Sequence, residues 1–265
     1  MKNIRIGVFI SGTGTNFQAV IDECKNENIP GNIVFVGTDN PLAKGIDRAK
    51  KNGIPYFIVD YDSIIQGFDK NQYQLPEDFN LDEIISKQTI FPKNYDRNKV
   101  EKFFKTRAIA EYELIKNMNE YPFDLLVLAG FMRNISPYFI DKISPDPLNP
   151  KIMNIHPALL PAFAGTDGYG DTFRYGCKIG GCTVHFIDYG SDSGPIIGQS
   201  SFPITEDDTL ESIKEKGLKI EWKLYPECIK LFAEKKIKVV NMTYNNASNE
   251  KIFQKKIVKI VSDMF

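Results

Sequence analysis

The sequence predicts an α/β fold: a mostly parallel β-sheet with helices on both of its faces. Three observations support this prediction. Short apolar runs rich in β-branched residues alternate with segments of helical periodicity. A glycine-rich turn joins the first of these runs to the first helical segment, and the most hydrophobic run, residues 125–129, lies near the middle of the chain. Strands that alternate with helices are typical of parallel sheets covered on both faces.

The first elements lie before residue 60. Apolar runs predict strands at 4–10, 33–36 and 55–59, with helices at 16–26 and 42–52 between them. In the first helix Phe17, Val20, Ile21 and Cys24 share one stripe, as expected for a helix that packs on a sheet. Residues 62–98 show no firm period and are rich in Gln, Asn, Asp and Lys, so we expect an insertion of loop and short helix.

The alternation resumes after the insertion, with a helix expected at 99–119 and a central strand at 125–129. Ser136 is expected to cap a short helix that starts with Pro137. A strand at 152–155 ends before Pro157, and the runs 182–187 and 196–202 are expected to form a strand pair. We expect a long helix at 209–235 with a kink near Pro226, and a tail that forms a strand or hairpin followed by a Lys-rich helix. The expected organisation is a domain at 1–240, with the insertion at 62–98, and a C-terminal extension at 241–265.

The composition and charge argue against several classes of function. The 265 residues are 42% hydrophobic and 25% charged, which suits a globular protein with a sizeable core. A net charge of -1 gives no overall attraction to nucleic acid or to an anionic membrane, and we expect neither as a partner. The start lacks a signal peptide, no run approaches the roughly 18 apolar residues of a membrane span, and four scattered cysteines with two histidines do not suggest zinc. We expect a cytoplasmic protein with reduced thiols and no metal.

The first candidate site is the glycine-rich segment 11–16, which reads SGTGTN between the first strand and the first helix. Glycines allow a sharp turn there, and a helix N-terminus offers N–H groups and a positive dipole end to a phosphate. Phe17 occupies the position of the third glycine of a dinucleotide motif, and no lysine follows as in a Walker loop. A monophosphate therefore fits better than a pyrophosphate, and a plain tight turn is the alternative.

The second candidate site is the segment Asn154-Ile155-His156-Pro157. Residues two apart on a strand project to the same face, so Asn154 and His156 are expected to point into one space at the carboxyl edge of the sheet. Histidine transfers protons near neutral pH, and an asparagine amide can donate to an oxygen that gains negative charge. The alternative is a structural histidine.

The third candidate site is the loop 188–195, which reads DYGSDSGP between two apolar strands. An aspartate from this loop could orient His156 and favour its charged form; a solvated loop is the alternative, and it is our interpretation of Asp188. His185 lies in the middle of the preceding strand, between Val184 and Phe186, and we interpret it as structural.

Four segments in order resemble the phosphoribosylglycinamide formyltransferase family of purine biosynthesis, from Ile4 to about Val240. They read ISGTGTN at 10–16, LAGFMR at 128–133, NIHPALLP at 154–161 and DSGP at 192–195. The resemblance implies a Rossmann-like formyltransferase fold. It also implies an enzyme, a one-carbon group transferase, that moves the formyl group of 10-formyltetrahydrofolate, its co-substrate, to the amine of glycinamide ribonucleotide. No metal is implied.

The resemblance also implies roles for particular residues. The family's catalytic residues match Asn154, His156 and Asp192. Its substrate-binding residues match Gly14, Thr15, Asn16 and Glu221. Its folate-binding residues match Arg107, Met132, Arg133, Asn134 and Ile135. In the implied reaction the amine attacks the formyl carbon directly, while Asn154 and protonated His156 stabilise the developing oxyanion and Asp192 holds His156.

The chain departs from the family pattern in two places that bear on the site. After Pro161 the family commonly has Pro-Gly-x-His followed by Gln-Ala, whereas Asp167 stands at the histidine position here. One turn before Glu221, Leu218 replaces a residue that is often polar. The loop at 162–174 borders the expected folate side, so the departure bears on folate contacts. The insertion and the tail after Val240 are also unlike the compact members.

Other functions remain as alternatives at this stage. Folate-dependent formyltransferases that act on an amino sugar nucleotide or on initiator methionyl-tRNA share the Asn-x-His and Asp elements. The monophosphate loop argues against both, and no basic C-terminal domain is expected. A formyltetrahydrofolate hydrolase carries a regulatory domain ahead of its first strand, for which we expect no room before Ile4. A non-catalytic nucleotide-binding protein is the alternative from another class. The assembly stays open between a monomer and a homodimer.

Overall fold

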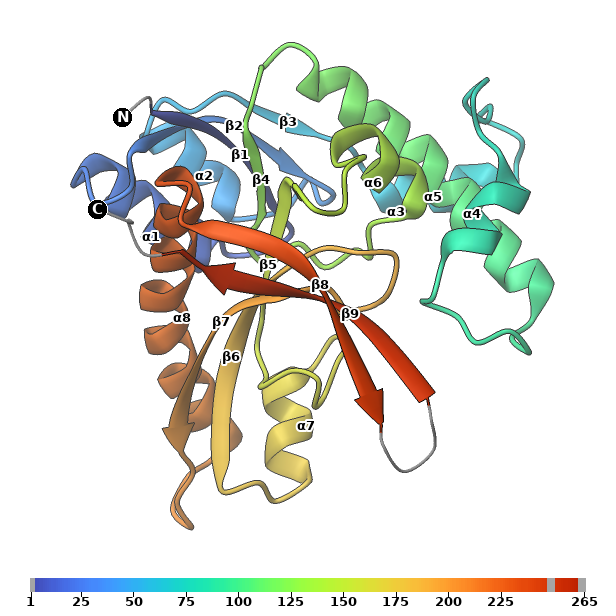
Figure 1. The fold of residues 1–265 in the computed structure, drawn as a ribbon. Helices are drawn as coiled ribbons and strands as arrows, with labels where there is room; N and C mark the ends of the chain where they lie inside the picture. The colour runs from blue at the N-terminus through green and yellow to red at the C-terminus, as the bar shows by residue number, and fades with distance from the viewer. Residues whose placement is uncertain (1–2, 247–250, 262–265) are drawn as a thin grey trace.

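A computed structural model describes residues 3–246 and 251–261, and within them the main element is a seven-stranded sheet (Figure 1). The strand order is β3-β2-β1-β4-β5-β6-β7. β1 to β5 pair in parallel, whereas β6 and β7 pair antiparallel beyond β5. The strands are β1 Ile4–Ile10, β2 Gly31–Thr38, β3 Tyr56–Ile58, β4 Leu125–Leu128, β5 Ile152–His156, β6 Ile179–Phe186 and β7 Ile196–Pro203. The predicted mostly parallel α/β fold is confirmed.

Helices cover both faces of this sheet, as predicted. In β4, Leu125 and Val127 belong to a core shared with α1, α2 and α8, whereas Leu126 and Leu128 face a second core shared with α3, α5 and α6. The alternation follows from the two-residue period of a strand. The helices are α1 Thr15–Lys25, α2 Gly45–Lys51, α3 Tyr61–Phe68, α4 Leu81–Lys87, α5 Arg97–Met118, α6 Pro137–Ile143, α7 Gly168–Arg174 and α8 Leu210–Ala233.

The expected insertion at 62–98 contains α4 and most of α3, joined by irregular chain, in agreement with the prediction of loop and short helix. It packs on α5 and α6 through its own small apolar cluster, which includes Ile84, Phe104 and Tyr138. The Tyr138 hydroxyl donates to Asp78 Oδ1 at 2.9 Å, which ties the insertion to α6. In Figure 1 this part of the chain lies at one end of the molecule, beside α5.

The N-termini of α6 and α8 are stabilised in different ways. Ser136 is the N-cap of α6 by position, but its side chain makes no cap hydrogen bond, so the capping prediction is wrong in its chemistry. Its hydroxyl donates instead to Glu111 on α5, because a buried carboxylate is a strong acceptor. The long helix α8 starts after Thr209, which forms a capping box with Ser212, and runs as one helix through the buried Pro226.

The tail forms a hairpin, as expected, but the expected Lys-rich helix is wrong. β8 Ile237–Asn246 and β9 Lys251–Ile260 pair antiparallel over their whole length (Figure 1). Val239 is paired with Val258, and both pack on the core that α8 shares with the sheet. Burial of this apolar pair, with one valine from each strand, favours the extended form over a helix, whose lysines would not gain such a contact.

Candidate active site

A cavity of about 560 Å³ opens at the carboxyl ends of the parallel strands β1, β4 and β5. The chain passes from β1 to β2 on one side and later returns to β4 on the other, and ligands of α/β sheets bind at such a switch point. The volume is within the range of small-molecule sites. The cavity is lined by segments 11–16, 128–135, 154–157, 165–169 and 190–192, together with Ile187, Lys214, Leu218 and Glu221.

The glycine-rich segment 11–16 forms one wall of the cavity. Gly14 is the N-cap of α1 with φ of 68°, a left-handed conformation that a side chain would strain. An added Cβ would also lie 3.0 Å from the Cα of Gly45, so α2 leaves no room there. The arrangement directs the N-terminus of α1 into the cavity, where its N–H groups suit a phosphate.

Asn154 and His156 lie on β5 and line the cavity together, two residues apart on one face. His156 is only 3% exposed. Its Nδ1 lies 3.5 Å from Asp192 Oδ2, and its Nε2 lies 2.8 Å from the carbonyl oxygen of Phe163. Each ring nitrogen therefore faces an oxygen to which an N–H can donate.

Asp192 is brought to the cavity by the loop between β6 and β7. Its Oδ2 accepts the backbone N–H of Gly165 at 2.9 Å. Burial opposes ionisation, yet contacts with His185 and His156 and the Gly165 N–H together hold the pKa of Asp192 below its usual value. The loop is anchored by Tyr189, whose hydroxyl donates to Asp141 on α6 at 2.5 Å.

His185 is a further polar residue of this cluster. It is fully buried on β6, directly opposite Asn154 on β5. Its Nε2 lies 3.2 Å from Asn154 Nδ2 and 3.6 Å from Asp192 Oδ1. Our interpretation of His185 as structural from its position in a strand did not reveal this neighbourhood, because the register between β5 and β6 cannot be read from the sequence.

The segment 130–135 follows β4 and forms the wall next to the glycine loop, because β4 is paired with β1. The Met132 N–H donates to Ser11 Oγ at 2.8 Å, which joins this segment to the glycine loop. Arg133 is ion-paired with the buried Asp39 at 2.5 Å and with Asp62 at 2.8 Å. Met132 is 58% exposed, and Asn134 and Ile135 complete this wall.

Arg107 is placed differently from the other expected site residues. It is not among the described residues that line the cavity, and it is only 7% exposed. Its guanidinium stacks on the rings of Phe103 and Tyr61, at 4.7 and 5.0 Å from their centroids. Burial lowers the pKa of Arg107. The structure thus brings together every expected site residue except this one.

Glu221 lies on α8 at the side of the cavity next to the glycine loop. Its carboxylate accepts from Asn16 Nδ2 at 2.6 Å and from the Tyr169 hydroxyl at 2.5 Å. Because the Asn16 side chain is turned toward Glu221, the backbone N–H groups of α1 are the more direct donors to a phosphate. Burial and the neighbouring carboxylate raise the pKa of Tyr169, so its hydroxyl keeps its proton.

Comparison with known proteins identifies the family. A model of the formyl transferase family matches residues 4–229. The chain belongs to this family. It is 34% identical over 226 residues to the phosphoribosylglycinamide formyltransferase of Bacillus subtilis (strain 168), a match that covers 85% of this chain and 93% of that relative. It is 31% identical over 241 residues to the Haemophilus influenzae protein of the same name, with coverage of 91% and 92%.

Solved structures of the formyl transferase family agree with the fold. The crystal structure of glycinamide ribonucleotide transformylase 1 from Symbiobacterium toebii superposes with a TM-score of 0.71 at 31% identity. The superposition covers 98% of this chain and 95% of that one. The family resemblance deduced from the four segments is therefore confirmed.

The two departures of this formyl transferase from the family pattern both lie at the cavity. Asp167 and Leu218 are lining residues. Asp167 precedes α7 and is ion-paired with Arg174 at 2.8 Å. The same segment supplies the Phe163 carbonyl to His156 and the Gly165 N–H to Asp192, so the divergent loop holds the catalytic candidates through its backbone.

The described residues contain no helix long and apolar enough to cross a membrane. Across 3–246 and 251–261, no group of three or more His, Cys, Asp or Glu side chains is arranged to hold a metal ion.

Proposed function

We propose that this formyl transferase moves the formyl group of 10-formyltetrahydrofolate to the amine of 5-phosphoribosylglycinamide (glycinamide ribonucleotide), a step of purine biosynthesis. The relatives described above bear the name of this activity. The observation that carries the proposal is the convergence of Asn154, His156 and Asp192 in one cavity with a glycine loop suited to one phosphate.

Each wall of the cavity has a part in the proposed reaction. The N-terminus of α1, at Gly14, Thr15 and Asn16, holds the substrate phosphate. Glu221 accepts hydrogen bonds from the glycinamide part of the same substrate. The folate lies against the neighbouring wall, formed by residues 132–135. The guanidinium groups of Arg107 and Arg133 both pack on the ring of Tyr61. Arg107 therefore supports the folate wall through Tyr61 without lining the cavity itself.

The chemistry needs no group beyond the two substrates and the side chains named. The uncharged amine nitrogen attacks the formyl carbon, a new C–N bond forms, and the formyl oxygen becomes negatively charged. Asn154 Nδ2 donates to this oxygen, the imidazolium form of His156 stabilises it through its positive charge, and Asp192 holds His156 in place. The bond between the carbon and the folate nitrogen then breaks, and the proton lost by the amine reaches the departing folate nitrogen with the help of His156.

We also propose the domain division, the cellular location and the oligomeric state of the enzyme. Residues 1–240 form the formyltransferase domain, with the insertion at 62–98, and residues 241–265 are a C-terminal extension; the family match over 4–229 supports this division. The small-molecule substrates and the four free thiols suit the cytoplasm. We propose that the enzyme forms a homodimer, and a measurement of its molecular mass in solution tests this proposal.

The test is a spectroscopic assay of tetrahydrofolate release. Purified protein is mixed with 10-formyltetrahydrofolate, with and without glycinamide ribonucleotide. Release that requires the ribonucleotide supports the proposal. Release without any amine points to the hydrolase, and release that requires an amino sugar nucleotide points to the sugar-specific formyltransferase. Binding of the ribonucleotide without turnover points to the non-catalytic alternative.

A further inference from the structure

Tyr169 reaches the same carboxylate as the glycine loop does. Its hydroxyl donates to Glu221 Oε1 at 2.5 Å, while Asn16 Nδ2 donates to Oε2 at 2.6 Å. All three side chains are at least nine-tenths buried and all three residues line the cavity. A carboxylate held from both sides by uncharged donors is fixed in one orientation, because any rotation breaks one of the two hydrogen bonds.

The ring of Tyr169 occupies a slot on α8, which is the space left where Gly217 has no side chain. A Cβ added at Gly217 would lie 2.2 Å from the Tyr169 hydroxyl oxygen and 2.1 Å from the ring carbon that bears it. Glycine in the interior of a helix is less favourable than alanine. The close approach of Tyr169 is a physical reason for a glycine at this position, and Phe202 packs on the ring from β7, at 6.2 Å between centroids.

The carboxylate retains capacity for a ligand. An ionised carboxylate accepts about four hydrogen bonds, and two of those of Glu221 are used by Tyr169 and Asn16. The buried Asn16 Oδ1 also has no hydrogen-bond partner among the described residues. An acceptor without a partner, beside a carboxylate that can accept two further hydrogen bonds, suits a substrate that presents N–H and O–H donors.

We propose that Tyr169 is a positioning residue for the ribonucleotide substrate, acting through Glu221. The inference rests on the proposed function and adds a residue that the family pattern did not point to. Tyr169 lies in the loop segment that departs from that pattern, and its slot at Gly217 adjoins Leu218, the second departure. The two departures belong to one arrangement, in which a tyrosine from α7 orients the substrate-binding glutamate of α8.

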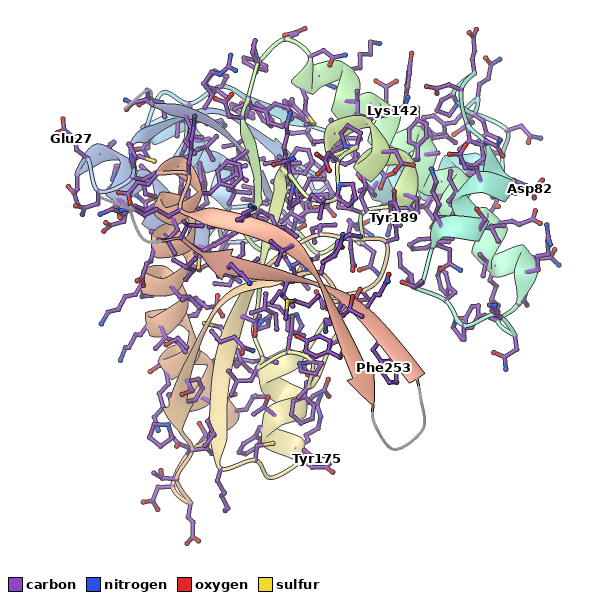
Figure 2. The ribbon with its side chains drawn as sticks, viewed as in Figure 1. Glu27, Asp82, Lys142, Tyr175, Tyr189 and Phe253 are labelled. Carbon is purple, nitrogen blue, oxygen red and sulfur yellow. The ribbon has the colours of Figure 1, made fainter. Side chains whose placement is uncertain are left out.

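The test compares Tyr169→Phe with Tyr175→Phe in the full-length enzyme. Phenylalanine keeps the ring against Gly217 and Phe202 and removes only the hydroxyl. Tyr175 is the matched control, since it lies just past α7, is 81% exposed and points to solvent (Figure 2). The readouts are KM for each substrate, kcat, and the Kd of glycinamide ribonucleotide measured by calorimetry without folate.

Loss of a hydrogen bond to a charged, buried group predicts that Tyr169→Phe raises KM and Kd for the ribonucleotide about tenfold or more. KM for the folate stays within about twofold, as do all constants of Tyr175→Phe. Combined with Glu221→Gln, Tyr169→Phe adds little, because both act on one interaction. An unchanged Kd and KM in Tyr169→Phe, in an enzyme that transfers formyl groups normally, overturns the inference alone. A wild-type enzyme that does not transfer the formyl group to this amine overturns the proposed function instead.

A second variant separates positioning from packing. Gly217→Ala pushes the ring of Tyr169 off its slot and is expected to raise KM for the ribonucleotide in the same way. If Gly217→Ala lowers the thermal stability and leaves this KM unchanged, Tyr169 is a packing residue and the inference fails.

Discussion

Asn154 and His185 face each other across the line where the sheet changes from parallel to antiparallel, with Asn154 Nδ2 3.2 Å from His185 Nε2. His185 Nδ1 lies 2.9 Å from the Phe186 carbonyl oxygen and donates to it, so in the neutral form of His185 the Nε2 accepts from the Asn154 amide. The buried histidine therefore fixes which end of the Asn154 amide is nitrogen. The second hydrogen of that nitrogen is then available to the formyl oxygen.

This relationship predicts an effect of His185 on turnover. His185→Ala removes the acceptor that holds the amide, so we expect kcat to fall about tenfold or more, while an outright loss of an oxyanion donor costs roughly 10²–10³-fold. His185→Gln can still accept from Asn154 and is expected to lose less. Steady-state kinetics with a circular dichroism check of folding measures both. Wild-type kcat in a folded His185→Ala enzyme contradicts this role.

Much of the fold could be predicted because its parallel strands are continuous apolar runs. The expected strand at 4–10 coincides with β1, and the expected run 125–129 with β4 to within one residue. β6 begins three residues before the expected Cys182, since Gly180 and Gly181 belong to the strand. Glycine is unfavourable in strands, but here the Phe202 ring and the Ser200 carbonyl approach so closely that a Cβ would not fit.

Site residues could be predicted where they lie in one segment of the sequence. Contacts between residues of separate segments could not be predicted. Asn154 and His156 share a strand face, which the two-residue period shows directly. The contacts of His185 with Asn154 and of Tyr169 with Glu221 join segments 31 and 52 residues apart, and neither spacing has a meaning without the fold. Arg107 matches the family pattern in sequence, but its side chain stacks on the ring of Tyr61 and is not among the described residues that line the cavity.

The left-handed conformation of Gly14 predicts a cost for any side chain there. Gly14→Ala should lower the free energy of unfolding by about 1 kcal/mol or more, from the φ of 68° and the contact with Gly45. It should also raise KM for the ribonucleotide, because the N-terminus of α1 shifts. Gly12→Ala is the control for stability, as its Cβ would meet nothing within 4 Å. Equal stabilities of the two variants in denaturant titrations contradict the prediction.

Glu111 predicts a dependence of stability on pH. Complete burial raises its pKa to about 7, against the opposing hydrogen bonds from Ser136 and the charge of Arg107. Between about pH 4.5 and 7 the folded state therefore keeps a proton that the unfolded state has lost, and the free energy of unfolding falls as the pH rises. The fall from this group is at most about 3 kcal/mol.

Denaturant titrations at pH 5 and pH 8 test the role of Glu111. Glu111→Gln should lose less stability than the wild type between these two values, because the amide has no proton to release. Glu120→Gln, at an exposed position just after α5, is the control and should follow the wild type. An identical pH dependence in all three proteins means that Glu111 does not titrate in this range.

Catalysis by the cluster of Asn154, His156 and Asp192 is tested by single-turnover formyl transfer with His156→Ala. The enzyme is in excess over 10-formyltetrahydrofolate, glycinamide ribonucleotide is supplied at saturating concentration, and folding is verified by circular dichroism. Loss of the group that stabilises the oxyanion and moves the proton predicts a rate at least about 10²-fold below that of the wild type, with formylglycinamide ribonucleotide still the product. A folded His156→Ala enzyme that transfers the formyl group at the wild-type rate contradicts catalysis by this cluster.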